Sequence, residues 1–404
     1  MEGKEENAMK KSLKKLASLG LAAAMVVSLV GCGTKDDGTT PGSDGNENGG
    51  TTNESGAATF KIGAIGPLTG EAASYGISVK NGAEIAIKEI NDAGGVTVGD
   101  KKYILEMNFA DDQASPDIAV SAFNTVMDWG AQAILGSVTS GSCLAIKKDT
   151  FEAGILQISP SGSALGCTEY ENAFRLCFTD PLQGVTMANL AKELGYEKIA
   201  IIYNNSDEYS TGILTAFTDQ VAANGGTIVA TEAFGKGAID FNTQLTKIKA
   251  TDAEVIFVPA YYNDAAYITQ QASDLGMNLP FLGSDGWDGV LAQVKDPAVL
   301  EGAIFLSPFF ANDEAPAIKK FVETYKTEYG AVPDQFAADG YDTVYVIKAA
   351  LEKASSVESK DLISAMTQIT VDGLTGSVSF TADGEPNKGA KYIEIKDGNY
   401  TARQ

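Results

Sequence analysis

Short apolar runs alternate from Thr59 onward with stretches in which an apolar residue returns every three or four positions. Runs such as "TFKIGAIG" and "KIAIIY" are typical of buried strands, and "NGAEIAIKEIND" is typical of an amphipathic helix. This alternation predicts parallel sheets joined by right-handed helical crossovers. Each predicted strand ends in a loop rich in Gly, Ser, Tyr or Asp, at the edge where open α/β sheets bind ligands.

The C-terminal part of the chain departs from this pattern. Two long helical stretches, "APAIKKFVETYKTEYG" and "DQFAADGYDTVYVIKAALEKA", precede the strand-like "LTGSVSFTADGE" and "AKYIEIKDGNY". Because helices alone cannot close a lobe, we expect the chain to return to the first lobe and then cross once more. The predicted fold is α/β with two lobes, each a parallel sheet flanked by helices, hinge-linked around a cleft. The predicted lobes are residues 59–179 with 309–384, and residues 180–308 with 385–404.

The N-terminus reads as an export signal. A lysine-rich start, an apolar core and a small-residue cleavage site make up "MKKSLKKLASLGLAAAMVVSLVGCG". The apolar run from Leu19 to Val30 is too short to span a membrane. The segment "LVGC" looks like a bacterial lipobox, which implies cleavage before Cys32 and a lipid on its thiol; the alternative is a buried cysteine in an ordinary signal peptide. Residues 1–31 are therefore the expected signal peptide, with translation starting at Met9.

The segment that follows is a predicted tether. Residues 32–57 comprise the lipidated cysteine and a stretch without large apolar side chains, a composition typical of a flexible linker. The remaining body, about 345 residues, suits two lobes better than one core. The chain carries 53 acidic and 30 basic residues, a formal net charge of -23, so nucleic acid is not an expected partner.

Three further cysteines follow Cys32. Cys177 lies in the apolar run "AFRLCFT" and is predicted to be a buried free thiol. Cys143 and Cys167 flank a serine-rich turn and could form a disulfide in an oxidising compartment, or all three thiols could stay reduced. With 0 His and no C-x-x-C spacing, the sequence predicts no metal site and no cofactor.

The serine-rich turn "ISPSGSA" places several hydroxyls directly after a predicted strand. A serine nucleophile would need a base, but the chain has 0 His and no Gly-x-Ser-x-Gly elbow after a strand. No Gly-x-Gly-x-x-Gly or Walker loop indicates nucleotide binding. Asp111 and Asp112 resemble a catalytic pair, although a solvated strand end explains them as well. The sequence therefore favours a binding protein over an enzyme.

The same turns can cradle a zwitterion. In "SVTSGSCLAI" a strand ends and a helix begins at Ser140, where free N–H groups and hydroxyls suit a carboxylate. Asp285 of "GSDGW" can offset an ammonium. The alternatives are that Ser140 and Ser163 are helix N-caps and that Asp285 shapes a turn.

Eight segments in order resemble the branched-chain amino acid (Leu/Ile/Val)-binding proteins of ABC importers, a periplasmic solute-binding family, here in lipoprotein form. The resemblance runs from Thr59 to the C-terminus, and no single segment decides it. The segments are "KIGAIGPLTGEAASYG", "NGAEIAIKEINDAGGV", "DDQASPDIAV", "ILGSVTSGSCLAI", "GILQISPSGS", "YNNSDEYSTG", "FLGSDGWDG" and "ADGYDTVYV".

The resemblance implies a set of ligand-binding residues. Hydroxyls of Ser140 and Ser163 would bind the ligand carboxylate, and the backbone carbonyl of Ser161 would accept from the ammonium. Asp285 would receive the ammonium at a position where glutamate is common in the family. Tyrosines would cover the ligand as the lobes close, namely Tyr75, Tyr209 and Tyr261.

The pocket for the ligand side chain is expected to be apolar. Val138 would line it, with Phe336 or Tyr341 reaching in from a late helix. We therefore expect a monomeric lipoprotein on the outer face of the cell membrane. It would capture a hydrophobic or branched-chain L-amino acid and deliver it to an ABC permease. The alternatives are a sensory solute-binding protein, or the same fold binding a polar amino acid, an amide or another small solute.

Overall fold

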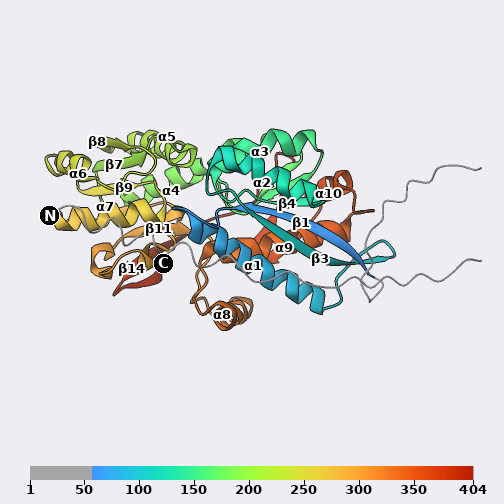
Figure 1. The fold of residues 1–404 in the computed structure, drawn as a ribbon. Coiled ribbons are helices and arrows are strands. Elements are labelled where there is room, and N and C mark those ends of the chain that lie inside the picture. Colours follow the sequence, from blue (N-terminus) through green and yellow to red (C-terminus); the bar gives the residue numbers. More distant parts are fainter. Residues whose placement is uncertain (1–56, 404) are drawn as a thin grey trace, which may run out of the picture. The chain divides into compact units, whose positions relative to one another are not determined.

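The computed structural model describes residues 57–403. The predicted signal peptide, Cys32 and nearly all of the tether lie outside these described residues. Two large sheets form the centre of the described chain, and helices cover them (Figure 1). The α/β fold class with helix-flanked parallel sheets is confirmed. None of the helices in residues 57–403 combines the length and the apolar character that a membrane span requires.

The first sheet has the strand order β2-β3-β1-β4-β5-β6. Strands β3, β1, β4, β5 and β6 run parallel, and β2 pairs antiparallel with β3 at the edge. Alternate residues of these strands face opposite sides: Ile65 packs against α2 and α3, while Ile62 and Ala64 belong to the core beneath α1 and α9. The strands are β1 (Ala58–Gly66), β2 (Val96–Val98), β3 (Lys101–Asp111), β4 (Ala133–Leu135), β5 (Leu156–Ser159) and β6 (Ala173–Arg175).

Helices from two distant parts of the sequence cover this sheet. The crossover helices α1, α2 and α3 come from its own βα units, whereas α9 and α10 come from the returning chain, and α8 packs on α1 (Figure 1). A separate hairpin follows them. The elements are α1 (Ala73–Asp92), α2 (Pro116–Asp128), α3 (Ser140–Glu152), α8 (Pro316–Tyr329), α9 (Gln335–Lys353), α10 (Ser359–Met366), β12 (Thr370–Gly373) and β13 (Gly376–Ser379).

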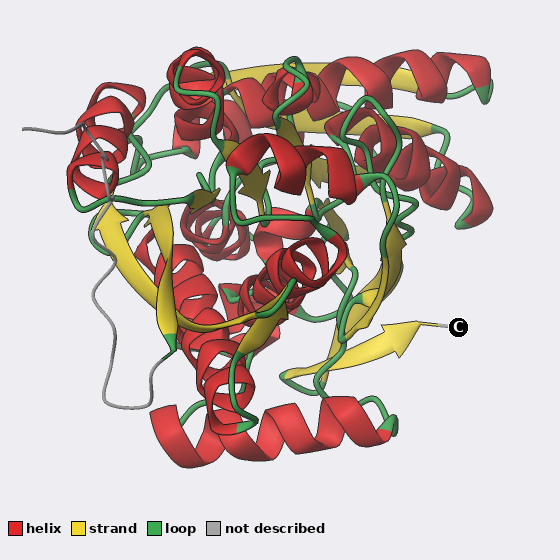
Figure 2. Cartoon of the chain, turned by 90° about the vertical axis from the view of Figure 1, so that its right-hand side faces the viewer, coloured by secondary structure: helices red, strands yellow, loops and turns green. Residues whose placement is uncertain are grey.

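The second sheet has the strand order β15-β14-β11-β10-β9-β7-β8. Figure 2 shows the strands of the chain with helices packed around them. Its strands are β7 (Lys198–Asn204), β8 (Thr227–Phe234), β9 (Val255–Val258), β10 (Phe281–Gly283), β11 (Ile304–Ser307), β14 (Lys391–Lys396) and β15 (Asn399–Arg403). Its α-helices are α4 (Asp180–Glu193), α5 (Glu208–Ala223), α6 (Asn242–Lys249) and α7 (Tyr262–Asp274).

Both sheets carry antiparallel strands at an edge, which differs from the purely parallel sheets that we predicted. Strands β14 and β15 are joined by Asp397 and Gly398, both with positive φ (49° and 68°). A two-residue turn of this kind can join only antiparallel neighbours, and Asp-Gly is its preferred sequence. A two-residue turn also joins the antiparallel strands β2 and β3; its first residue, Gly99, has a positive φ of 57°.

Two glycines let α1 and α9 approach closely. A Cβ on Gly82 would lie 1.8 Å from the carbonyl oxygen of Ala337, and a Cβ on Gly340 would lie 2.2 Å from that of Val79. No other residue fits at either position without moving a backbone. The contact holds α9, which follows β11 of the second sheet in sequence, against α1.

Candidate functional site

Loops at the C-terminal ends of strands from both sheets meet around a small cavity. The segments after β4 and β5 of the first sheet contribute, together with those after β9 and β10 of the second and the starts of α1, α5 and α9. The cavity has a volume of about 10 Å³. It is lined by Tyr75, Val138, Thr139, Ser140, Ser161, Tyr209, Tyr261, Asp285, Gly286 and Phe336.

All of the predicted ligand-binding residues except Ser163 line this cavity. Ser163 lies directly behind Ser140, and its backbone N–H donates to Ser140 Oγ at 3.2 Å. Of the two late-helix aromatics that we considered, Phe336 lines the cavity and Tyr341 instead donates to Glu89. The spacing explains the difference, because five residues place Tyr341 about 140° around α9 from Phe336.

The hydroxyls form an ordered set at the start of α3. Ser140 Oγ accepts from the N–H groups of both Ser163 and Ala164 at 3.2 Å, so its own proton remains free to donate. Ser161 Oγ donates to the carbonyl of Val138 at 2.6 Å. The first backbone N–H groups of a helix have no intrahelical acceptor. Together these donors suit a carboxylate.

A buried arginine that we did not single out from the sequence holds the serine-rich turn. The guanidinium of Arg175 donates to the carbonyls of Gly162 (3.0 Å), Ala164 (2.9 Å) and Leu165 (3.1 Å). It also pairs with Glu385 at 2.9 Å, while its own side chain is fully buried. The available signal was the lone charge in the apolar run "AFRLCFT". Arg175 therefore positions the turn without lining the cavity.

Asp285 is the carboxylate of the cavity. It is 4% exposed, and Tyr209 donates its hydroxyl to Oδ1 at 2.6 Å. The backbone N–H of Asp285 donates to Gln183 Oε1 at 2.9 Å. Burial raises the pKa of Asp285 to about 6. A cation placed beside it would favour the ionised form.

Aromatic rings close the cavity from both sides. The ring centroid of Tyr75 lies 4.1 Å from that of Phe336 and 5.4 Å from that of Tyr261. Tyr75 donates its hydroxyl to the carbonyl of Gly286 and accepts from the N–H of Tyr262 at 3.1 Å. Tyr75 lies on α1, which covers the first sheet, whereas Tyr261, Tyr262 and Gly286 follow strands β9 and β10 of the second sheet. The contacts of Tyr75 with these residues therefore join the two halves directly.

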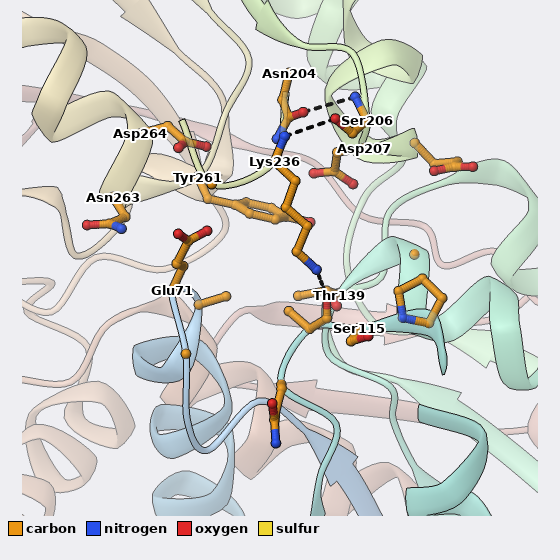
Figure 3. Close-up of a pocket in the computed structure, with 18 of the residues that line it drawn as sticks. Glu71, Ser115, Thr139, Asn204, Ser206, Asp207, Lys236, Tyr261, Asn263 and Asp264 are labelled. Atoms are coloured by element: carbon orange, nitrogen blue, oxygen red, sulfur yellow. Dashed lines mark hydrogen bonds between the residues drawn. The ribbon is translucent and has the colours of Figure 1, made fainter. Parts of the chain in front are cut away.

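A larger cavity of about 470 Å³ adjoins the small one and shares Thr139 and Tyr261 with it (Figure 3). Its lining includes three acids, Glu71, Asp207 and Asp264, which face it from both halves. Burial raises the pKa of Asp207 to about 6 and that of Asp264 to about 7, with Glu71 adding to the second. We refer to it as the outer cavity. Our sequence analysis singled out none of these acids, although two of them lie at helix starts just after strands.

These raised pKa values predict that the protein without ligand becomes more stable as the pH falls from about 8 toward 5. An unfolded aspartate titrates near 3.9, so folded Asp285, Asp207 and Asp264 hold their protons at higher pH than the unfolded chain does. At pH values above their folded pKa these groups are ionised, which lowers the free energy of unfolding. Lowering the pH protonates them and restores that stability. Urea unfolding at pH 8, 6.5 and 5 measures the effect, and Asp264→Asn should reduce it. A free energy of unfolding that falls across this range would contradict the expectation.

Two other predictions concern residues around the cradle. Cys143 and Cys167 are free thiols that lie together in a small buried cluster. Of the two alternatives, a disulfide or reduced thiols, the structure therefore has the reduced thiols. Cys177 is also free and buried.

Asp112 is not at a solvated strand end. It is fully buried, and it accepts from the N–H of Ala114 at 2.9 Å and from the Ser137 hydroxyl. It therefore fixes two loops.

Comparison with known proteins shows the family of the chain. The periplasmic binding protein family matches residues 59–399. The Leu/Ile/Val-binding protein homolog 3 of Brucella melitensis biotype 1 is 31% identical over 306 residues, which cover 75% of this chain and 81% of the relative.

Solved structures agree with this placement. The branched-chain amino acid transporter substrate binding protein LivJ from Streptococcus pneumoniae, in complex with isoleucine, is 31% identical with a TM-score of 0.78, covering 85% of this chain and 99% of that one. A solute binding protein from R. palustris in complex with benzoate is 21% identical with a TM-score of 0.77, covering 85% of this chain and 95% of that one, and shows the fold alone. The chain belongs to the periplasmic binding protein family, and it is similar over most of its length to the Leu/Ile/Val-binding proteins.

Proposed function

We propose that this protein is the substrate-binding subunit of an ABC amino-acid importer. It captures a hydrophobic or branched-chain L-amino acid between its two lobes and delivers it to the permease, without covalent chemistry. The observation that carries the proposal is one buried cavity that combines hydroxyl donors, a carboxylate and an aromatic wall. Open α/β sheets bind their ligands at this edge.

The two ends of the zwitterion find different partners in the proposed complex. The ligand carboxylate accepts from the free hydroxyl proton of Ser140 and from the N–H groups at the start of α3. The ammonium is offset by Asp285 and also donates to the backbone carbonyl of Ser161. Both residues line the cavity, and Tyr209 donates its hydroxyl to Oδ1 of Asp285.

The remaining wall suits an aliphatic side chain. Val138, Phe336, Tyr75 and Tyr261 line the cavity and are largely apolar there. Burial of a branched aliphatic side chain against such a wall contributes about 1.5–3 kcal/mol. The names of the relatives point to the same ligands, and isoleucine is the ligand in the S. pneumoniae structure.

Ligand entry requires the lobes to separate. A cavity of about 10 Å³ holds about one water molecule, so no amino acid fits in the present arrangement. The bonds that must break first include Tyr75 to Gly286 and the contact of Ser74 Oγ with Tyr262 at 2.9 Å. Binding then follows the hinge closure that this kind of protein uses.

The location and partners complete the proposal. Residues 1–31 act as the signal peptide, Cys32 carries the lipid, and the tether lets a monomeric body reach a permease from the outer face of the cell membrane. The lobes comprise residues 59–179 with 309–384, and residues 180–308 with 385–404. The second candidate is transport or sensing of a more polar solute, which the acids of the outer cavity favour.

A thermal-shift screen of the protein against the L-amino acids, two amides and benzoate tests the ligand class. A ligand bound only by the folded state at a hundredfold excess over its dissociation constant adds about 2.7 kcal/mol, or a few degrees in Tm. We expect shifts with isoleucine, leucine and valine. Shifts confined to polar amino acids or amides would favour the second candidate, and a shift with benzoate alone would sink the amino-acid proposal.

A further inference from the structure

Asp180, the first residue of α4, is a buried carboxyl group without a partner. Its side chain is 1% exposed, and neither carboxylate oxygen forms a hydrogen bond to any other residue in the part of the chain that the structure describes. Burial raises the pKa of Asp180 well above its usual range. Buried polar groups are nearly always paired, so an unpaired buried carboxylate needs an explanation.

Helix capping does not explain it. Acids are common in the first turn of a helix, where they bond free N–H groups or offset the helix dipole. Here Thr179 is the cap, because its hydroxyl accepts from the N–H of Leu182 at 3.3 Å. The charge of Arg175 attracts Asp180, but the guanidinium N–H groups donate to carbonyls of the serine-rich turn and to Glu385 instead of to Asp180.

The surroundings of Asp180 place it beside the ammonium end of the site. Its backbone N–H donates to the carbonyl of Ser163 at 3.0 Å, and its charge repels that of Asp285. The hydroxyl of Ser163 and Nε2 of Gln183 are likewise buried and unpaired within residues 57–403, while Gln183 Oε1 already holds the backbone of Asp285. On the other side, Gly212 of α5 leaves room, since a Cβ there would lie 2.9 Å from Asp180 Oδ2.

We propose that Asp180 is a specificity-determining residue: with Asp285 it presents a second negative charge that only a protonated amine on the ligand offsets. The inference rests on the proposed amino-acid function and deepens it. It also moves Ser163 from the carboxylate side, which the family resemblance implies, to the ammonium side. Ser163 lies close enough to Asp180 to oppose the rise of its pKa. In the ligand complex the Ser163 hydroxyl, which is unpaired among the described residues, would donate to Asp180 and offer a lone pair to the ammonium.

The two acids together explain discrimination by charge. An ammonium on the ligand favours the ionised forms of Asp180 and Asp285, whereas a monocarboxylate without an amine brings a negative charge that both acids disfavour. An amino acid brings the matching ammonium, so the protein should prefer it over its α-hydroxy analogue of the same shape. Such preferences are large where buried polar groups of the site are otherwise left unpaired.

Calorimetric titration of Asp180→Asn with L-isoleucine and with 2-hydroxy-3-methylpentanoate tests the proposal. We expect the variant to lose about tenfold or more in affinity for isoleucine while it binds the hydroxy acid as well as, or better than, the parent does. The ratio of the two affinities thus shrinks. A purely structural role would lower both affinities together and leave the ratio unchanged, and that result would overturn the proposal.

Matched variants keep the outcome unambiguous. Asp128→Asn removes an exposed charge at the end of α2 and should leave the ratio as in the parent. If Asp180→Asn does not fold, Ser163→Ala serves instead: it should weaken isoleucine and spare the hydroxy acid, whereas equal loss of both returns Ser163 to the carboxylate side and refutes the assignment. A parent protein that binds no amino acid overturns the proposed function, and this inference with it. Parent binding with an unchanged ratio in the variant overturns the inference alone.

Discussion

Asp285→Asn should weaken the binding of isoleucine by about a hundredfold or more, because removing one partner of a buried charge pair costs about 2–5 kcal/mol. The asparagine keeps the shape of the side chain, and its carbonyl oxygen can still accept from Tyr209, which donates to Asp285 Oδ1 at 2.6 Å. What it loses is the charge that offsets the ligand ammonium. Calorimetry with L-isoleucine measures the change directly.

The same substitution should make the protein without ligand more stable at pH 7. Burial raises the pKa of Asp285 to about 6, so at pH 7 the folded state carries an ionised group that it disfavours. At pH values above the folded pKa, ionised Asp285 lowers the free energy of unfolding by at most about 3 kcal/mol. A variant that binds at least a hundredfold more weakly yet melts higher would show that Asp285 is kept for the ligand. Binding within threefold of the parent, matching the control Asp128→Asn, would refute its role.

Gly82→Ala should cost about 3 kcal/mol of stability or more. A Cβ at this position would lie 1.8 Å from the carbonyl oxygen of Ala337, which is backbone and cannot rotate away. Helices α1 and α9 would have to move apart, and overpacking of this kind typically costs about 1–3 kcal/mol and sometimes more. The contact matters because it fastens the returning chain to the first sheet.

Urea unfolding measures this loss against a matched substitution. A Cβ on Gly389 would meet nothing within 4 Å, and that glycine is exposed, so Gly389→Ala should unfold like the parent. If Gly82→Ala shows the same midpoint as Gly389→Ala, the close packing of α1 on α9 does not hold the fold together as we describe.

The order of strands and helices was predictable because each element has a local pattern. The strand–helix alternation, the long late helices and the terminal strand segments could all be read from apolar spacing. The antiparallel edges were missed because their decisive feature is a turn of two residues, Asp397 and Gly398, rather than a periodicity. The close approach of Gly82 to Ala337 and of Gly340 to Val79 is a property of packing between helices, which spacing within one helix does not reveal.

The residues that line the cavity could largely be predicted from the sequence, whereas the buried charged residues behind them could not. Ser140, Ser161 and Asp285 follow strands directly, and parallel strands bring such ends together. Asp180 was missed because "TDPLQG" reads as an ordinary helix start, and nothing local shows that its carboxyl group is buried. Arg175 was missed for the same reason, since its partners lie in the serine-rich turn and at Glu385.

Calorimetric titration of the full protein with L-isoleucine at pH 7.5 tests the central claim most directly. The account predicts saturable binding of one isoleucine per protein, weaker binding of D-isoleucine, and loss of the signal in Asp285→Asn. The enantiomers should differ because the carboxylate donors, the acid and the aromatic wall fix three arms of one carbon. Saturation by benzoate with no heat from isoleucine, leucine or valine would contradict the account while leaving the fold as described.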